Sequence, residues 1–292
     1  MAADGANVLN PGPLLGAALV AAAVMLTACG STSVSPKSVA GAATKTSSLK
    51  SYRVQTTTTL KLGKRDVTFK GDGVFAPKGR RGRLSLDMSA LNQISGAEGS
   101  PYNLGYAQFV LDGTSIYMRI PLLKQLNPSL KPWVKLDLGQ AGRTRALDFG
   151  SFLQFGQGGD PTQALEYLRA TGKLEKKGTD TVRGVSTTHY KGAVDLRKVA
   201  DKAPANLRAE LRTNVDRVIA LTGSSTIPVE VWVDEQGYVR KERYTEKLEL
   251  QGHKVDVEES VELFDFGTPV IAPVPPAADV SDFTAATTGS SS

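Results

Sequence analysis

The chain has 292 residues, of which 40% are hydrophobic and 22% charged, and its formal net charge is +6. Its single cysteine, Cys29, excludes an internal disulfide. Lys and Arg are spread along the chain and mixed with acids, which argues against nucleic-acid binding, because nucleic-acid-binding proteins gather basic residues on one face with aromatic residues between them. A chain of this length can bury a substantial core, and we expect one folded domain.

Residues 1–28 have the features of a secretory signal peptide. Their apolar run, residues 14–26, is rich in Ala and shorter than the roughly 20 apolar residues that span a membrane. The segment before this run departs from a usual signal, because it contains no Lys or Arg and carries Asp4. No second long apolar run follows, so we expect no membrane-spanning helix elsewhere.

The apolar run ends in Leu26-Thr27-Ala28-Cys29, which resembles a bacterial lipobox. In lipoproteins with that motif, a diacylglycerol alkylates the thiol and the chain is cleaved before the cysteine. The resemblance implies that acylated Cys29 anchors the protein to the extracytoplasmic face of the cell membrane. The alternative is a buried Cys29 that packs as a small hydrophobe. Residues 29–36, which are rich in Ser and Thr, are expected to form the acylated Cys and its tether.

The folded domain is expected over residues 37–272 and begins with a predicted helix at 37–49. Alternation of polar and apolar residues then predicts a series of strands. In the first half of the domain they cover residues 51–62, 67–75, 83–89, the hairpin 107–120, and 133–138. Gly71-Asp72-Gly73 predicts a bulge or sharp bend in the second strand, and Asp112-Gly113 predicts the hairpin turn.

The second half alternates helical and extended segments. Helices are expected at 148–171 and 195–222, and strands at 173–183, 185–195, 227–234, 238–250 and 253–266. We interpret the acidic run Asp256-Val257-Glu258-Glu259 as a solvated edge. Residues 273–292, rich in Pro and then in Ser, Thr and Ala, are expected to be a disordered tail.

These elements predict an α+β fold in which roughly nine to eleven strands form one large antiparallel sheet, with the helices gathered on one face. Such a sheet curves, and the helices pack on its concave face. One alternate set of side chains along every strand then points toward the helices.

The chain resembles the actinobacterial LppX/LprG-type lipoproteins, which are relatives in fold of LolA and LolB. The resemblance rests on the lipobox, on Leu49-Lys50-Ser51-Tyr52-Arg53-Val54 with the Thr-rich strand that follows, on Ile227-Pro228-Val229-Glu230-Val231-Trp232-Val233-Asp234, and on Phe266-Gly267-Thr268-Pro269-Val270. It covers most of the domain. It implies a half-open β-barrel around helices, with an apolar cavity that holds the acyl chains of an envelope lipid or lipoglycan.

The residues expected to line this cavity are apolar positions of the alternating strands. They are Leu84, Leu86, Met88, Phe109, Leu111, Ile116, Met118, Val229, Val231 and Val233. An open cavity and a filled core demand the same residue types, so both interpretations stay open for each of these residues.

The sequence contains no recognisable catalytic motif. His189 and His253 lie on separate predicted strands, and neither has the residue spacing of a zinc site. We therefore expect no catalytic residue, no metal and no cofactor. A carboxylate pair that cleaves glycosides stays open, because acids are numerous.

The functional hypothesis is a membrane-anchored lipoprotein that binds acyl chains and carries a lipid within the cell envelope. Two alternatives remain. One is a lipid-sensing or protein-binding regulatory lipoprotein without transport, and the other is a structural cell-wall lipoprotein without a ligand. Protein partners are not readable from the residues.

Overall fold

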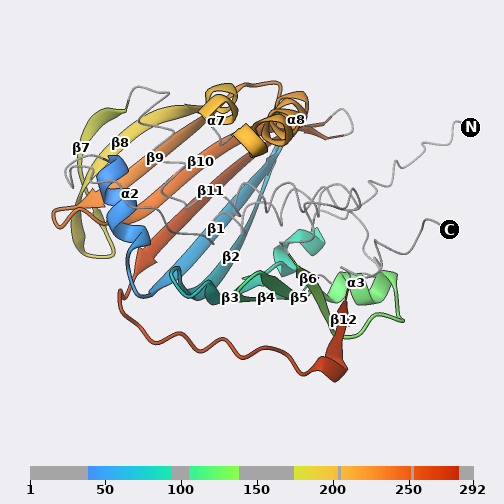
Figure 1. Cartoon of the computed structure of the whole chain (residues 1–292). Helices are drawn as coiled ribbons and strands as arrows, with labels where there is room; N and C mark the ends of the chain where they lie inside the picture. The colour runs from blue at the N-terminus through green and yellow to red at the C-terminus, as the bar shows by residue number, and fades with distance from the viewer. Residues whose placement is uncertain (1–38, 94–104, 138–173, 203–204, 251–252, 283–292) are drawn as a thin grey trace, which may run out of the picture.

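The computed structural model describes residues 39–93, 105–137, 174–202, 205–250 and 253–282. These residues form a twelve-stranded sheet in the order β12-β6-β5-β4-β3-β2-β1-β11-β10-β9-β8-β7. The sheet is strongly curved and does not close into a barrel, and helices α2, α7 and α8 lie over one of its faces (Figure 1). The predicted α+β fold with a half-open sheet and helices on the concave face is therefore confirmed.

The strands match the sequence prediction closely, and the hairpin turn at Asp112-Gly113 is confirmed by a positive φ of 61° at Gly113. Neighbouring strands are antiparallel except for β12 and β6. The strands are β1 (Tyr52–Leu62), β2 (Arg65–Ala76), β3 (Arg81–Asp87), β4 (Tyr106–Asp112), β5 (Ser115–Arg119), β6 (Trp133–Asp137), β7 (Glu175–Val182), β8 (Val185–Asp195), β9 (Thr226–Asp234), β10 (Val239–Leu250), β11 (His253–Phe264) and β12 (Val280–Asp282).

The described helices are α2 (Val39–Ser47), α3 (Pro121–Leu126), α7 (Leu196–Lys202) and α8 (Ala205–Thr222), with short 3₁₀ turns η2 (Ser89–Gln93) and η3 (Ala277–Asp279). The helices expected near residue 37 and at 195–222 are thus present, the latter as two helices. The helix expected at 148–171 lies outside the described residues. Within the described ranges, no helix has the length and apolarity that a membrane crossing requires.

Helix α2 packs on strands β9 and β10 through small residues. Ala42 and Ala43 are fully buried, and the absence of bulky side chains lets the helix approach the sheet. Thr46 fastens the contact, because its hydroxyl donates to the Ala42 carbonyl at 2.7 Å and accepts the Val239 backbone N–H at 2.8 Å.

The bulge predicted at Gly71-Asp72-Gly73 is wrong. Strand β2 pairs with β1 in unbroken register through this stretch, with Gly71 opposite Thr56 and Gly73 opposite Val54. A Cβ at Gly71 would overlap Leu86 and approach the Thr56 hydroxyl to 2.7 Å. The glycines therefore leave room on the concave face for side chains of the neighbouring strands.

The prediction that the tail is disordered from residue 273 is also wrong for its first part. Residues 277–279 form a 3₁₀ turn, and β12 then pairs in parallel with β6, with Ser281 opposite Val134. The Ser281 hydroxyl accepts the Lys131 backbone N–H at 2.9 Å, and Lys135 lies 3.6 Å from the Asp282 carboxylate. These backbone and charge contacts order a segment whose apolar content is too low to predict a fold.

Candidate functional site

The concave face of the sheet is the candidate functional site. All ten residues expected from the sequence lie on this face and belong to, or pack against, one hydrophobic cluster that also includes α2. Nine of them are buried and Phe109 is partly buried. The strand register brings them together because every second residue of each strand faces the same side.

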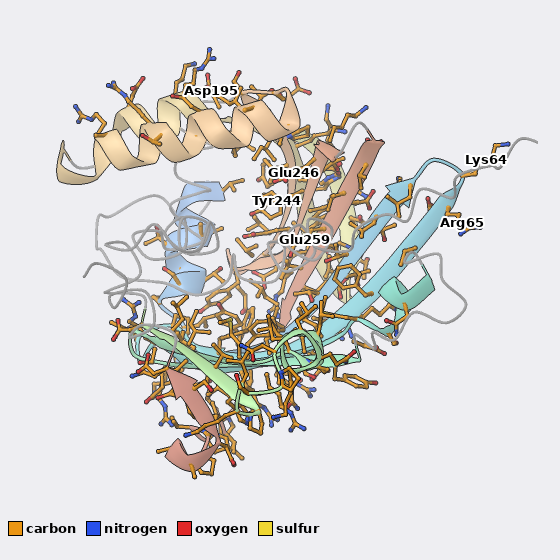
Figure 2. All side chains as sticks on the ribbon, turned by 90° about the vertical axis from the view of Figure 1, so that its right-hand side faces the viewer. Lys64, Arg65, Asp195, Tyr244, Glu246 and Glu259 are labelled. Atoms are coloured by element: carbon orange, nitrogen blue, oxygen red, sulfur yellow. The ribbon has the colours of Figure 1, made fainter. Side chains whose placement is uncertain are left out.

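Polar side chains interrupt this apolar face near the middle of the sheet. In the register of β1, β11 and β10, Thr58 lies opposite Glu259, and Glu259 lies opposite Tyr244. Figure 2 shows Tyr244, Glu246 and Glu259 on the side of the sheet where the helices lie. We call the six polar residues that share this part of the face the concave polar cluster: Thr56, Thr58, Glu242, Tyr244, Glu246 and Glu259.

Within the concave polar cluster, Tyr244 donates a hydrogen bond from its hydroxyl to Glu242 Oε2 at 2.6 Å. Glu259 is only 7% exposed, and its Oε1 atom has no hydrogen-bond partner. The hydroxyl of Thr56, which is 2% exposed, likewise has none. Buried polar atoms without a partner are uncommon in folded proteins and call for an explanation.

Burial and like charge act together on the acids of the cluster. Burial raises the pKa of Glu259 well above its ordinary value, and the nearby Glu246 and Glu242 raise it further. Burial also raises the pKa of Glu246. The pKa of Tyr244 is raised first by burial and then by the charge of Glu242. These side chains therefore favour their neutral forms more than exposed ones do.

The interpretation of the acidic run 256–259 as a solvated edge is wrong. Strand β11 lies in the interior of the sheet between β1 and β10. Only Asp256 and Glu258 face the convex side, whereas Glu259 shares the concave face with Val257 and Val261. The sequence pattern of β11 could have predicted this, because Glu259 alternates in phase with the valines of the strand. The charge of the run led instead to the solvated interpretation.

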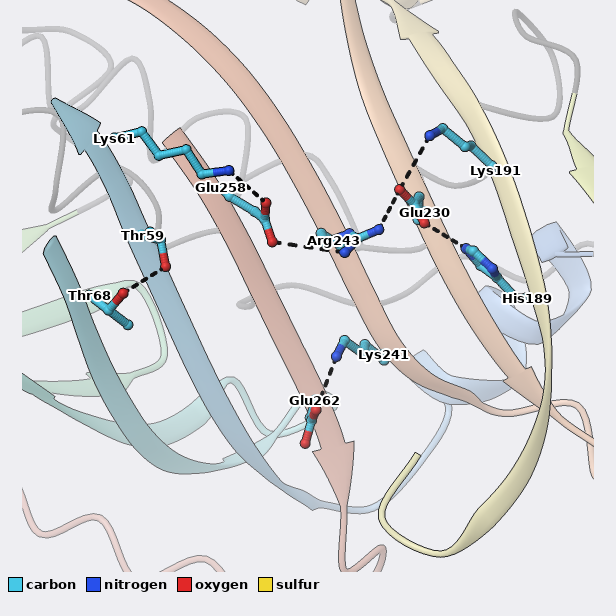
Figure 3. A network of polar contacts seen from close by, with 10 residues as sticks. All are labelled: Thr59, Lys61, Thr68, His189, Lys191, Glu230, Lys241, Arg243, Glu258 and Glu262. Carbon is cyan, nitrogen blue, oxygen red and sulfur yellow. Dashed lines mark hydrogen bonds and ion pairs between the residues drawn. The ribbon is translucent and has the colours of Figure 1, made fainter. Parts of the chain in front are cut away.

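The convex face carries a different kind of polar network, centred on Glu230 of β9 (Figure 3). Its carboxylate accepts a hydrogen bond from Arg243 at 2.6 Å, lies 2.7 Å from His189 Nε2, and lies 3.6 Å from Lys191 Nζ. The His189 ring stacks on Trp232 with centroids 4.4 Å apart. Burial by itself raises the pKa of Glu230, but the hydrogen bond and charge of Arg243 outweigh it, so the pKa is lowered.

Ion pairs continue this network along the convex face. Glu258 lies 3.8 Å from Lys61 and 3.9 Å from Arg243, and Glu262 lies 2.8 Å from Arg183 and 3.3 Å from Lys241. Glu230, Glu258 and Glu262 thus have cationic neighbours, whereas none is resolved for Glu259 among the described residues. We interpret the convex network as a stabilising surface layer, and His189 as a part of it.

Two further sequence predictions concern Cys29 and metal binding. Cys29 lies outside the described residues, so its acylation remains a prediction. In the part of the chain that the structure describes, no group of three His, Cys, Asp or Glu side chains is arranged to hold a metal ion.

Comparison with known proteins gives a partial sequence relative and solved structures of similar fold. No protein-family model matches it. An uncharacterized 31.2 kDa protein of the rplA-rplJ intergenic region of Streptomyces griseus is 35% identical over 127 residues, which is 44% of this chain and 40% of the relative's length. The aligned part thus spans less than half of that relative.

Solved structures with a similar fold include two mycobacterial proteins. The lipoprotein LppX of Mycobacterium tuberculosis is 14% identical, with a TM-score of 0.43 over 80% of this chain and 94% of its own. LprF of Mycobacterium bovis is 15% identical, with a TM-score of 0.38 over 85% of this chain and 100% of its own. At these identities, both structures are similar to this chain in fold alone.

Proposed function

We propose that this protein is an envelope lipoprotein, anchored through acylated Cys29, that holds the acyl chains of a lipid or lipoglycan against its concave face and carries the molecule within the envelope. The observation that supports this proposal is the wide apolar face of a sheet that does not close. The described helices make their main sheet contacts with β8, β9 and β10, whereas apolar side chains also cover the concave side of β3, β4 and β5.

An acyl chain on such a face gains enough free energy to be held. Each buried methylene contributes about 0.8 kcal/mol, so about ten methylenes contribute roughly 8 kcal/mol before the entropic cost of association. Binding of this kind is reversible and requires no energy-coupling motif. Transfer is then passive or depends on other envelope components.

Native mass spectrometry of residues 30–292, purified without detergent, tests the proposal. Far-ultraviolet circular dichroism first establishes that this piece retains its strand content. We expect lipid to co-purify and to be released by organic extraction. Folded protein that is repeatedly empty, also after incubation with envelope lipid extract, would contradict lipid carriage and favour a regulatory or structural lipoprotein.

A further inference from the structure

We infer that the concave polar cluster is a subsite for the ammonium group of an amine-bearing amphiphile, whose acyl chains lie on the surrounding apolar face. This inference rests on the proposed function, because it specifies the polar end of the ligand that the concave face holds. It assigns a role to the acids that neither the lipid-binding face nor the convex network uses.

The first support is the unpartnered oxygen of Glu259. Its Oε1 atom is buried and accepts no hydrogen bond, and the Thr56 hydroxyl on the same face is also without a partner. Glu259 lies between Thr58 and Tyr244 on its two neighbouring strands, so its carboxyl group is central to the cluster. A ligand that donates hydrogen bonds would satisfy an acceptor that the described protein leaves vacant.

The second support is the charge around the cluster. In the strand register, no Lys or Arg is in phase with Glu259 on β1, on β11 or on residues 241–250 of β10. The pKa of Glu259 is raised by burial and by the charges of Glu246 and Glu242, and the pKa of Glu246 by burial, and no cation of the described part of the chain acts against these effects. The missing positive charge is therefore one that a ligand can supply.

The third support is that the concave polar cluster is partly accessible to solvent and is surrounded by apolar side chains. Tyr244 and Glu246 keep partial solvent exposure although β10 is an interior strand, so this part of the concave face is reachable. Val257 and Val261 flank Glu259 along β11, and both are buried in the hydrophobic cluster. A small cation alone would leave this apolar surface unused, whereas an amphiphile covers both parts.

The same charges discriminate between polar groups. A phosphate or carboxylate placed beside Glu242, Glu246 and Glu259 would meet like charge in a partly desolvated site. A hydroxyl can donate one hydrogen bond but offers no charge. An ammonium group offers three donors and a positive charge, and hydrogen bonds in which one partner is ionised are about twice as strong as those between neutral groups.

Three amphiphiles of equal chain length separate these possibilities. The full chain carrying Cys29→Ser, which has no acyl anchor, is loaded with pyrene as an uncharged apolar fluorophore. Hexadecylamine, hexadecanol and palmitate then compete with pyrene at neutral pH. We expect hexadecylamine to displace pyrene at an about tenfold lower concentration than hexadecanol, and palmitate to be the weakest competitor.

Two variants in the same chain complete the test. Glu259→Gln keeps the shape of the side chain and should bring hexadecylamine and hexadecanol to within about twofold of each other. Glu258→Gln is the matched control on the convex face of the same strand and should retain the preference. Thermal unfolding of each variant establishes that it is folded.

The outcomes are distinct. Equal competition by the three amphiphiles, or an amine preference that survives Glu259→Gln, overturns the ammonium subsite and leaves lipid binding intact. Failure of all three amphiphiles and of pyrene to bind overturns the proposed function as well.

Discussion

At the residue scale, glutamates on the two faces of one sheet have opposite electrostatic surroundings. Glu230 on the convex side is held by Arg243 at 2.6 Å, which lowers its pKa. Glu259 on the concave side has burial and two acidic neighbours, which raise its pKa. The difference arises because adjacent strand positions face opposite sides, and only the convex side presents cations to these acids.

We predict that Glu259→Gln increases the stability of the ligand-free protein at neutral pH. A raised pKa means that the folded state keeps a proton that the unfolded state releases. The contribution of Glu259 to the stability of the folded protein is therefore complete below the ordinary glutamate pKa of about 4.3. It is lost as the pH rises through the pKa that Glu259 has in the folded state. Glutamine cannot ionise, so the free energy of unfolding of the variant should be about 1–3 kcal/mol higher than that of the unmodified protein at neutral pH. At acid pH the two proteins should not differ in this way.

Urea unfolding of both proteins at several pH values between about 4 and 8 measures this difference. Glu258→Gln, which removes the exposed ion pairs with Lys61 and Arg243, should change the free energy of unfolding by less than about 1 kcal/mol. A loss of stability in Glu259→Gln at every pH would show that the carboxylate has a partner in the folded protein.

At the scale of one element, β2 shows why composition misleads about strand shape. Glycine in a strand commonly marks a bulge, but Gly71 and Gly73 keep β2 in register with β1. Side chains from the neighbouring strands, Leu86 and Val54 among them, occupy the room that a Cβ would take. The identity of those neighbours is a property of the sheet and not of the strand.

Gly71→Ala should therefore destabilise the protein by about 1–3 kcal/mol, because the new methyl group overlaps Leu86 and approaches the Ser85 carbonyl to 2.9 Å. Gly79→Ala is the control and should be nearly neutral, because the new Cβ would lie 3.9 Å from its nearest neighbour, the Ala76 carbonyl oxygen. Thermal unfolding compares the two. Equal stability of both variants would show that β2 and β3 can separate without cost.

Neighbouring residues of strand β5 allow the concave and convex faces of the sheet to be compared for lipid binding. Met118 is buried on the concave face, whereas Tyr117 faces the convex side opposite Lys135. If the concave face holds a lipid, Met118→Trp should lower the co-purifying lipid by about half or more at a modest cost in stability, and Tyr117→Trp should leave lipid content unchanged. Unchanged lipid with a large loss of stability in Met118→Trp would indicate a packed core.

At the scale of the whole molecule, the sheet is a continuous curved layer whose last strand comes from the segment expected to be disordered. Strand β12 extends the sheet beyond β6, while β7 forms the opposite edge (Figure 1). The charged residues of β7 suit an edge strand, because charge discourages pairing with another chain. The helices that contact β8, β9 and β10 leave the two ends of the sheet differently covered.

The proposed acyl anchor at Cys29 would determine where the whole protein is located. Cys29→Ser should abolish metabolic labelling with palmitate and shift the protein from membranes to soluble or unprocessed fractions. Ser31→Ala, two residues further along, should leave labelling and fractionation unchanged. Undiminished palmitate labelling of Cys29→Ser would refute the lipobox interpretation.

The sequence alone determined strands β1 to β11, the hairpin at Asp112-Gly113, the helix before β1 and the apolar face, because these follow from alternation and from local turn chemistry. The resemblance of residues 26–29 to a lipobox likewise rests on adjacent residues alone. Tertiary structure decided which face Glu259 shares, why Gly71 is required and that β12 pairs with β6. Each of these depends on the residue that lies opposite on a neighbouring strand, and strand order is set by long-range pairing that no local pattern encodes.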